Sequence, residues 1–283
     1  MNPGQDARAT LTDKGVCKSL TRQPDTSPMQ STILFATVLM ERNRWTAEKR
    51  PTVAVSAWLA DLARAGFDGI ELWQNHAVEA SEQEREALTA SPLPVAIFNS
   101  YVAFTDVDAE GRERVADLVR RFACSAVKFN LSSCLETRAQ EIAEARRWFA
   151  SMPGVTPLCE CHPGTSVEHA AAAAAAFADW PELRIIVHPF FFSAETLQGW
   201  FDAFGPRISH CHVQIRQPGP NGIFTRLDEQ IEPVADQTRR VLRNGFAGSW
   251  AIEFTKGVCT PDDSPALLIA AAIQDLRTLR TLV

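Results

Sequence analysis

The chain has 283 residues, 46% of them hydrophobic, which is enough for one large core or for two smaller ones. Its formal net charge of −6 argues against nucleic acid or an anionic membrane surface as the main partner, because both attract a basic protein face. No apolar run approaches the roughly 20 residues of a membrane span, and the first thirty residues lack the apolar segment of a secretory signal.

The seven cysteines are scattered along the chain and include no CxxC pair. We therefore expect free thiols and a cytoplasmic location rather than a disulfide framework. Residues 1–30 are polar, contain Gly and Pro, and show little periodicity, which predicts a flexible tail. Met29 is a possible alternative start. Residues 31–283 are predicted to form the ordered domain.

After the tail, apolar runs typical of strands alternate with helical patterns. These runs cover residues 32–40, 67–73, 93–100, 125–131, 155–161, 183–191, 208–215 and 249–254. Eight such strand–helix units in about 250 residues predict an α/β fold of one domain, the (β/α)₈ TIM barrel. A doubly wound open sheet is the competing fold, but it usually has a glycine fingerprint after its first strand, and this sequence has none there.

Side chains that are ionisable or of a type that binds metals and ligands gather at the ends of the predicted strands. In a TIM barrel the carboxyl ends of the strands form the active-site mouth, so these residues are the candidates for chemistry. In chain order they are Glu71, Lys128, Asn130, Glu160, His162, His188, His210, His212, Gln214 and Glu253.

The stretch "LCECHPGT" (158–165) places two thiols beside a carboxylate and an imidazole. Side chains of a strand alternate between its two faces, so Glu160 and His162 share one face while Cys159 and Cys161 share the other. A zinc knuckle would need both thiols turned toward one metal, and a nucleophilic cysteine would need a positioned base. We favour buried structural cysteines that point outward against the helices.

Four such positions follow or end four successive strands: Glu160, His188, a histidine of the seventh strand (His210 or His212) and Glu253. Taken singly, each has an ordinary interpretation, as a hydrogen-bonded core histidine or as a glutamate that emerges into solvent. Together, two carboxylates and two imidazoles suit one divalent first-row ion, Mn²⁺, Co²⁺, Fe²⁺ or Zn²⁺, rather than Mg²⁺ or Ca²⁺. The pattern of four favours a metal site.

Several motifs resemble those of one superfamily, the xylose isomerase-like TIM barrels, which include sugar phosphate isomerases and epimerases and share the fold of family 2 AP endonucleases. "AGFDGIELW", "LCECHPGT", "HCHVQI" and "GFAGSWAIEF" follow the family's order, and the resemblance covers roughly residues 32–280. It implies that Glu160, His188, His212 and Glu253 hold one metal. The family usually has Asp where this chain has His188, and Gln214 is the alternative to His212.

The resemblance also implies a divalent-metal-dependent isomerase or epimerase that acts on a ketose, keto-polyol or small hydroxy-keto acid through an enediolate. Glu160 and Glu253 would then be both ligands and the acid/base pair. A lyase similar to inosose dehydratase is the first alternative. A non-catalytic ligand-binding barrel is the second.

The expected partner is a small sugar-like molecule, and a homo-oligomer stays possible. The candidates for binding this substrate are His162, Lys128, Arg216, Trp73 and Glu71. His162 can instead be a supporting residue beside Glu160. Arg216 can hold a carboxylate or phosphate, or can be a solvated loop charge. Trp73, which ends the second predicted strand, is expected to pack against a sugar ring.

Overall fold

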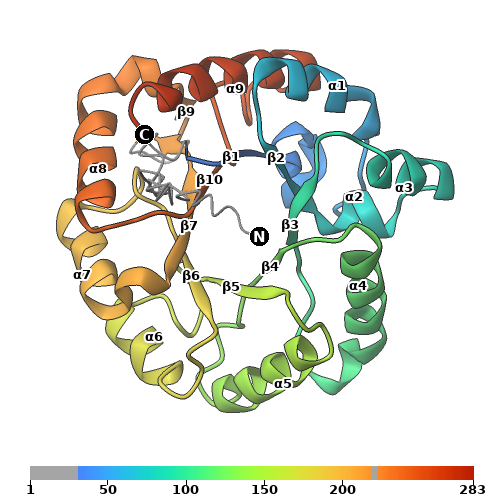
Figure 1. The fold of residues 1–283 in the computed structure, drawn as a ribbon, viewed down its shortest axis with the longest axis vertical. Coiled ribbons are helices and arrows are strands. Elements are labelled where there is room, and N and C mark those ends of the chain that lie inside the picture. Colours follow the sequence, from blue (N-terminus) through green and yellow to red (C-terminus); the bar gives the residue numbers. More distant parts are fainter. Residues whose placement is uncertain (1–30, 218–221) are drawn as a thin grey trace, which may run out of the picture. The chain divides into compact units, whose positions relative to one another are not determined.

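The structure, a computed structural model, describes residues 31–217 and 222–283. The tail expected for residues 1–30 therefore lies outside the described residues. Eight parallel strands close into a barrel in the order β1-β10-β7-β6-β5-β4-β3-β2, and helices surround it (Figure 1). The predicted (β/α)₈ TIM barrel is confirmed.

The barrel strands are short and lie within the predicted apolar runs. They are β1 (Ile33–Ala36), β2 (Gly69–Trp73), β3 (Val95–Asn99), β4 (Ala126–Phe129), β5 (Thr156–Glu160), β6 (Arg184–Val187), β7 (Ile208–Val213) and β10 (Ser249–Ile252). The labels β8 (Ile215–Arg216) and β9 (Phe224–Thr225) belong to a separate antiparallel hairpin after β7.

The helices around the barrel are α1 (Ser56–Ala65), α2 (Gln74–Val78), α3 (Glu82–Thr89), α4 (Ala109–Arg121), α5 (Arg138–Ala150), α6 (Ala170–Ala176), α7 (Ala194–Phe204), α8 (Ile231–Arg243) and α9 (Pro265–Arg280). Short 3₁₀ turns join them: η1 (Thr37–Met40), η2 (Arg42–Trp45), η3 (Asp106–Asp108), η4 (Gly205–Arg207) and η5 (Leu227–Gln230). Within the described ranges, no helix has both the length and the apolar content needed to cross a bilayer.

Two apolar runs extend beyond the strands they contain. The run 32–40 continues from β1 into η1, whose four residues are all buried. The run 183–191 leaves the strand at Val187, so that His188 starts the following loop. In both places the loop is packed into the protein, so an apolar sequence continues where the strand has ended. The hairpin of β8 and β9 was not predicted, because its strands have two residues each.

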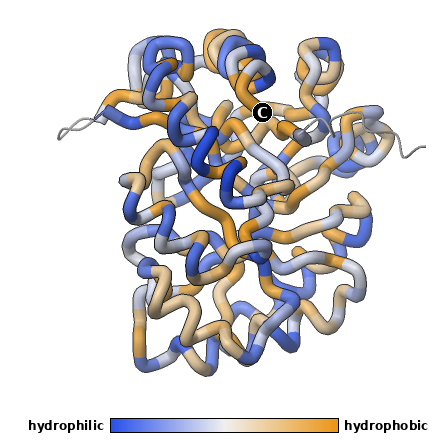
Figure 2. Tube along the Cα trace, turned by 60° about the vertical axis from the view of Figure 1, so that its left-hand side comes forward, coloured by the Kyte–Doolittle hydropathy of each residue, from blue (hydrophilic) through white to orange (hydrophobic). Residues whose placement is uncertain are grey.

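Alternation along the strands divides the side chains between the barrel interior and the helices. The interior cluster contains mainly Leu34, Ala36, Trp73, Ile97, Ala126, Leu158, Ile186 and Ala251. The opposite faces of the strands join the larger core beneath the helices, and Cys159, Cys161 and Cys211 belong to it, as predicted for the first two. In Figure 2 the strands in the middle of the molecule are accordingly mainly hydrophobic.

Gly248 permits a close approach between β10 and β7. A Cβ atom at this position would overlap the carbonyl oxygen of Ser209, while Ser249 pairs with His210 in the next step of the ladder. Only glycine fits without movement of the backbone.

Asp275 gives the fold a predicted pH dependence. Its carboxyl is buried between α9 and η5, where it contacts the Thr255 hydroxyl (2.5 Å) and accepts a hydrogen bond from the Leu227 N–H. Burial raises the pKa of Asp275 to about 7. The folded protein therefore keeps a proton that the unfolded chain loses above its pKa of about 3.9, so this group's contribution to stability falls as the pH rises from about 4 to 7.

We expect Asp275→Asn to remove this pH dependence, which is on the order of a few kcal/mol. Asparagine can keep both contacts without burying a charge. Urea unfolding at pH 5, 6.5 and 8 should show that the variant loses less stability than wild type over this range. Parallel curves for the two proteins would contradict the assignment.

Candidate metal centre and active site

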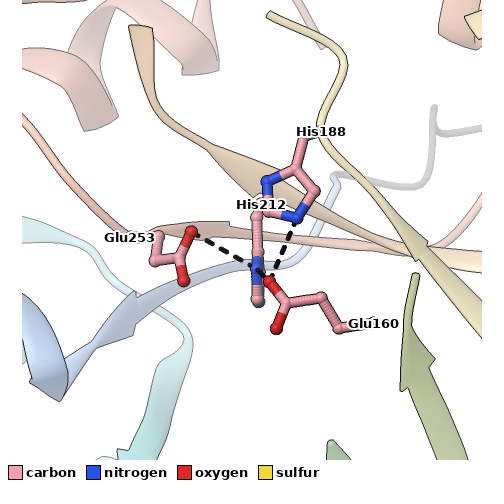
Figure 3. A group of neighbouring side chains, drawn as sticks. All are labelled: Glu160, His188, His212 and Glu253. Atoms are coloured by element: carbon pink, nitrogen blue, oxygen red, sulfur yellow. Dashed lines mark hydrogen bonds and ion pairs between the residues drawn. The ribbon is translucent and has the colours of Figure 1, made fainter. Parts of the chain in front are cut away.

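Four buried side chains meet at the carboxyl ends of four neighbouring strands. Glu160 ends β5, His188 directly follows β6, His212 lies in β7, and Glu253 directly follows β10. One candidate ligand atom of each lies within 4.8 Å of the others. Figure 3 shows the four side chains pointing toward one another. The structure thus brings together the four residues proposed from the sequence.

The distances within this group are those of direct contacts. His212 Nδ1 lies 3.1 Å from Glu160 Oε1 and 3.4 Å from Glu253 Oε2. His188 Nε2 lies 3.0 Å from the same oxygen of Glu160. Gln214, the alternative ligand, lines the site differently: its amide nitrogen donates to Glu253 Oε2 (2.8 Å) and lies 3.1 Å from His188 Nδ1.

Strand order and an irregularity in the sheet produce this convergence. Strands β5, β6, β7 and β10 are consecutive neighbours in the barrel, so the ends of all four reach one side of its mouth. The pairing of β6 with β7 shifts between Ile185 and Ile186. Such irregularities redirect the side chains that follow them, and here His188 follows within two residues.

The donor set fits a divalent first-row cation. Carboxylate oxygens and imidazole nitrogens are the ligands such ions accept. His188 Nε2 is buried and makes no hydrogen bond within the described part of the chain, although it lies 3.0 Å from a carboxylate oxygen. An unpaired ring nitrogen buried beside two carboxylates is costly by itself, and a bound cation would give it a partner.

Glu160 is held in its ionised form by its surroundings. Burial alone would raise the pKa of this carboxyl, but the Lys128 ammonium, 2.6 Å from Oε2, and the adjacent imidazoles of His188 and His212 lower it well below the usual range. Asn130 also donates to Oε2 (3.1 Å). The predicted substrate-binding residue Lys128 is thus the ion-pair partner of Glu160, and it also lines the cavity above.

Glu253, in contrast to Glu160, is shifted toward its protonated form. Burial and repulsion from Glu160 raise its pKa above the usual value, and the nearby His212 only partly offsets this. No ammonium or guanidinium forms an ion pair with Glu253 among the described residues. The two carboxylates therefore differ in how easily each takes up a proton, the arrangement that separates an acid from a base in one site.

A second layer of polar residues lies beneath the cluster. Glu71 Oε2 accepts from His210 Nε2 and His212 Nε2, both at 3.1 Å, and Oε1 accepts from Asn99 Nδ2 at 2.8 Å. Glu71 is completely buried, and the two imidazoles lower its pKa against the effect of burial. Glu71, His210 and His212 also form a second group with metal-ligand geometry, which shares His212 with the first.

Two predicted substrate contacts lie too deep for that role. Glu71 and Trp73 have no exposed surface and do not line the cavity. The Trp73 ring packs edge-on against His76 and fills the barrel interior, so it has no face left for a sugar ring. Glu71 instead supports His212 from below. Glu71 lies within β2 and Trp73 ends it. The sequence alone did not show how deep these two side chains lie in the barrel.

A cavity of about 390 Å³ opens above the cluster and is lined by the other predicted substrate-binding residues, His162, Lys128 and Arg216. His162 lines it, half-buried, with Nδ1 2.7 Å from the Pro163 carbonyl. Arg216 lines it from β8 and is exposed. A second cavity, of about 410 Å³, lies near α1 and α3 and contains none of the four clustered residues.

Loops after β1 and β3 add residues that the sequence did not single out. Trp45 and Lys49 reach the cavity from the segment after β1, and Tyr101 from the loop after β3. Tyr101 is the only tyrosine of the chain and lies two residues beyond the end of β3. Its place just after a strand was the one feature of the sequence that could have identified it as a cavity residue. Trp45 and Lys49 lie several residues after η1. The sequence of that segment has no periodicity from which the direction of their side chains could be predicted.

Comparisons with known proteins agree with this fold. No family model matches the chain, and no curated protein matches it. Among solved structures, the probable 3-DHS dehydratase AsbF from Bacillus anthracis is similar, with a TM-score of 0.66 and 16% identity over 88% of this chain and 98% of that one.

Two further structures are similar at the same level. The 3-keto-D-glucoside 4-epimerase YcjR from E. coli has a TM-score of 0.63 and 16% identity over 89% of this chain and 99% of its own. The IolI protein, with a bound zinc atom, has a TM-score of 0.62 and 13% identity over 89% and 98% of the two chains. This chain therefore has the fold of the xylose isomerase-like TIM barrels.

Proposed function

We propose that this protein is a divalent-metal-dependent isomerase or epimerase that acts on a ketose, a keto-polyol or a small hydroxy-keto acid. The observation that carries the proposal is the meeting of Glu160, His188, His212 and Glu253, with ligand atoms within 4.8 Å of one another at the base of a cavity. The zinc bound by the similar IolI protein supports a metal in this chain as well.

The chain's own residues are placed for proton transfer. Glu160 and Glu253 come from β5 and from the end of β10, three strands apart around the barrel, so a substrate held between them would meet them on different sides. One of the two, as its carboxylate, takes a proton from a carbon next to a carbonyl group, and the other, as its carboxylic acid, gives a proton to the substrate. Lys128 and Asn130 hold Glu160 in place through contacts of 2.6 and 3.1 Å.

A divalent cation held by the four residues would supply the positive charge that stabilises negative charge developing on substrate oxygens. His212 keeps its orientation through Glu71 below. Trp45, Tyr101, Phe191 and Phe254 line the cavity and exclude part of the water around the substrate. Exclusion of water strengthens every electrostatic contact inside.

A lyase that expels water from a keto-polyol is the second candidate. Its first step, removal of a proton beside a carbonyl, uses the same carboxylates. The similarity to a probable dehydratase favours it.

A panel of keto-polyols followed by NMR in D₂O tests the proposal. An isomerase or epimerase should place deuterium on carbon and keep the carbon skeleton. Loss of water would identify the lyase. A protein that binds a panel member without either change would be a ligand-binding barrel, and the proposed enzymatic function would be wrong.

A further inference from the structure

The charges around the cavity do not balance once a cation is bound. Among the described residues, two acidic ones line it, Glu160 and Glu253, and both belong to the proposed metal centre. A divalent cation would offset the charges of these two carboxylates. This step rests on the proposed function. The net charge that a substrate then meets in the cavity depends on the basic residues that line the cavity.

In the described part of the chain, four side chains of Lys or Arg line the same cavity: Arg44, Lys49, Lys128 and Arg216. Arg44 is neutralised by Asp263, which it contacts at 2.9 and 3.2 Å through both terminal nitrogens, and both side chains are buried. Lys128 is the partner of Glu160. Lys49 and Arg216 form no ion pair with any described acidic residue.

Arg216 has the geometry of an anion-binding group. Its Nε donates to the carbonyl oxygen of Gly222 (3.1 Å), and its guanidinium lies 5.9 Å from the centre of the Phe224 ring. These contacts connect the two strands of the β8–β9 hairpin and fix the base of the guanidinium. The terminal nitrogens make no hydrogen bond to the described residues, so they are free to bind a carboxylate or phosphate in a fork.

Lys49 adds a second free cation within the same cavity. Its ammonium lies 4.6 Å from the centre of the Tyr101 ring, and the Lys128 ammonium lies 4.8 Å from the same ring. Two ammonium groups against one aromatic ring concentrate positive charge beside the cavity. A partly enclosed site lined by one sign of charge attracts ligands of the opposite sign.

We propose that the substrate carries an anionic group, a carboxylate or a phosphate, and that Arg216 and Lys49 bind it while the hydroxy-keto end lies at Glu160 and Glu253. The buried cluster and the two more exposed cations occupy different depths of one cavity. A substrate with a charged end and a reactive end would use both. Neutral sugars would leave Arg216 and Lys49 without a partner.

Three ketoses that differ only at carbon 6 test this inference. D-Fructose is neutral there, D-fructuronate carries a carboxylate, and D-fructose 6-phosphate carries a phosphate. Calorimetric titration of the Co²⁺-loaded protein at low salt should give at least tenfold tighter binding for one of the anionic ketoses than for fructose. A charged hydrogen bond commonly contributes that much, and the stronger of the two anions identifies the group.

Arg216→Gln and Lys49→Gln assign the effect to these residues. We expect at least one of the two variants, and most strongly Arg216→Gln, to remove the advantage of the anionic ketose while fructose binds as before. Arg239→Gln is the matched control, because Arg239 is an exposed arginine on α8 that does not line the cavity.

The inference is wrong if neither anionic ketose binds at least tenfold more tightly than fructose. It is also wrong if the advantage persists in both variants. Metal content measured on the same samples separates this result from a failure of the proposed function: a protein that binds metal but shows no preference for anions would retain the metal centre and lose only the inference about the substrate.

Discussion

Replacing Glu253 by Gln is expected to slow deuterium exchange into the substrate by roughly 10²- to 10⁴-fold, the usual contribution of a positioned acid or base. Glutamine keeps the size of the side chain and can still accept the hydrogen bond that Gln214 donates. It cannot take up or release the proton. NMR in D₂O measures the exchange rate on whichever panel substrate the wild-type protein turns over.

Glu229→Gln provides the matched control for this variant. Glu229 is paired with Lys256 (2.6 Å) and lies outside the cavity, so its removal should leave the exchange rate unchanged. An exchange rate in Glu253→Gln within a factor of a few of wild type would exclude Glu253 as the proton-transfer group. Glu253 is the more informative of the two carboxylates, because Glu160→Gln would also break the contact with Lys128.

Replacing Glu71 by Ala is expected to weaken metal binding by about 10- to 100-fold, although Glu71 does not reach the cavity. The loss follows from His212, whose Nε2 would lose its carboxylate acceptor and whose ring would no longer be held with Nδ1 toward Glu160 and Glu253. His210 would lose the same acceptor. Breaking a buried charged network of this kind also lowers the free energy of unfolding by about 3–5 kcal/mol.

Two further variants separate the loss of metal from the loss of stability. Glu41 is a buried glutamate bound to His76 (2.8 Å) outside the cluster, so Glu41→Ala should destabilise the protein but keep its metal affinity. Glu71→Gln should retain most of the affinity, since Asn99 Oδ1 has no partner among the described residues and can accept from the new amide. Equal metal affinity in Glu71→Ala and wild type, measured by Co²⁺ titration, would contradict the role of Glu71.

The convergence of the four clustered residues was predictable because it depends on simple rules. Strand alternation placed Glu160 inward and Cys159 outward, and barrel topology places the ends of successive strands side by side. Neither rule needs the positions of the helices or loops. Alternation placed His210, His212 and Gln214 on one face, and the family resemblance gave Gln214 as the alternative to His212. In the structure His212 contacts both Glu160 and Glu253, whereas Gln214 donates to Glu253.

The depth of a residue and the path of a loop were not predictable in the same way. Trp73 ends its strand, as a substrate contact would, yet its ring is enclosed in the barrel. Lys49 and Tyr101 reach the cavity from loops whose directions depend on tertiary contacts, such as the packing of the Lys49 ammonium on the Tyr101 ring. Such contacts join residues that are distant in the sequence and have no periodic pattern.

The central claim, a metal centre formed by residues from four strands, is tested most directly by the metal content of the purified protein. Inductively coupled plasma mass spectrometry should find close to one first-row metal ion per chain in wild type and little metal in Glu253→Ala and His188→Ala. Metal retained in His188→Ala alone would assign His188 to the substrate instead. Absence of metal in wild type, even after reconstitution with Mn²⁺, Co²⁺ and Zn²⁺, would contradict the account.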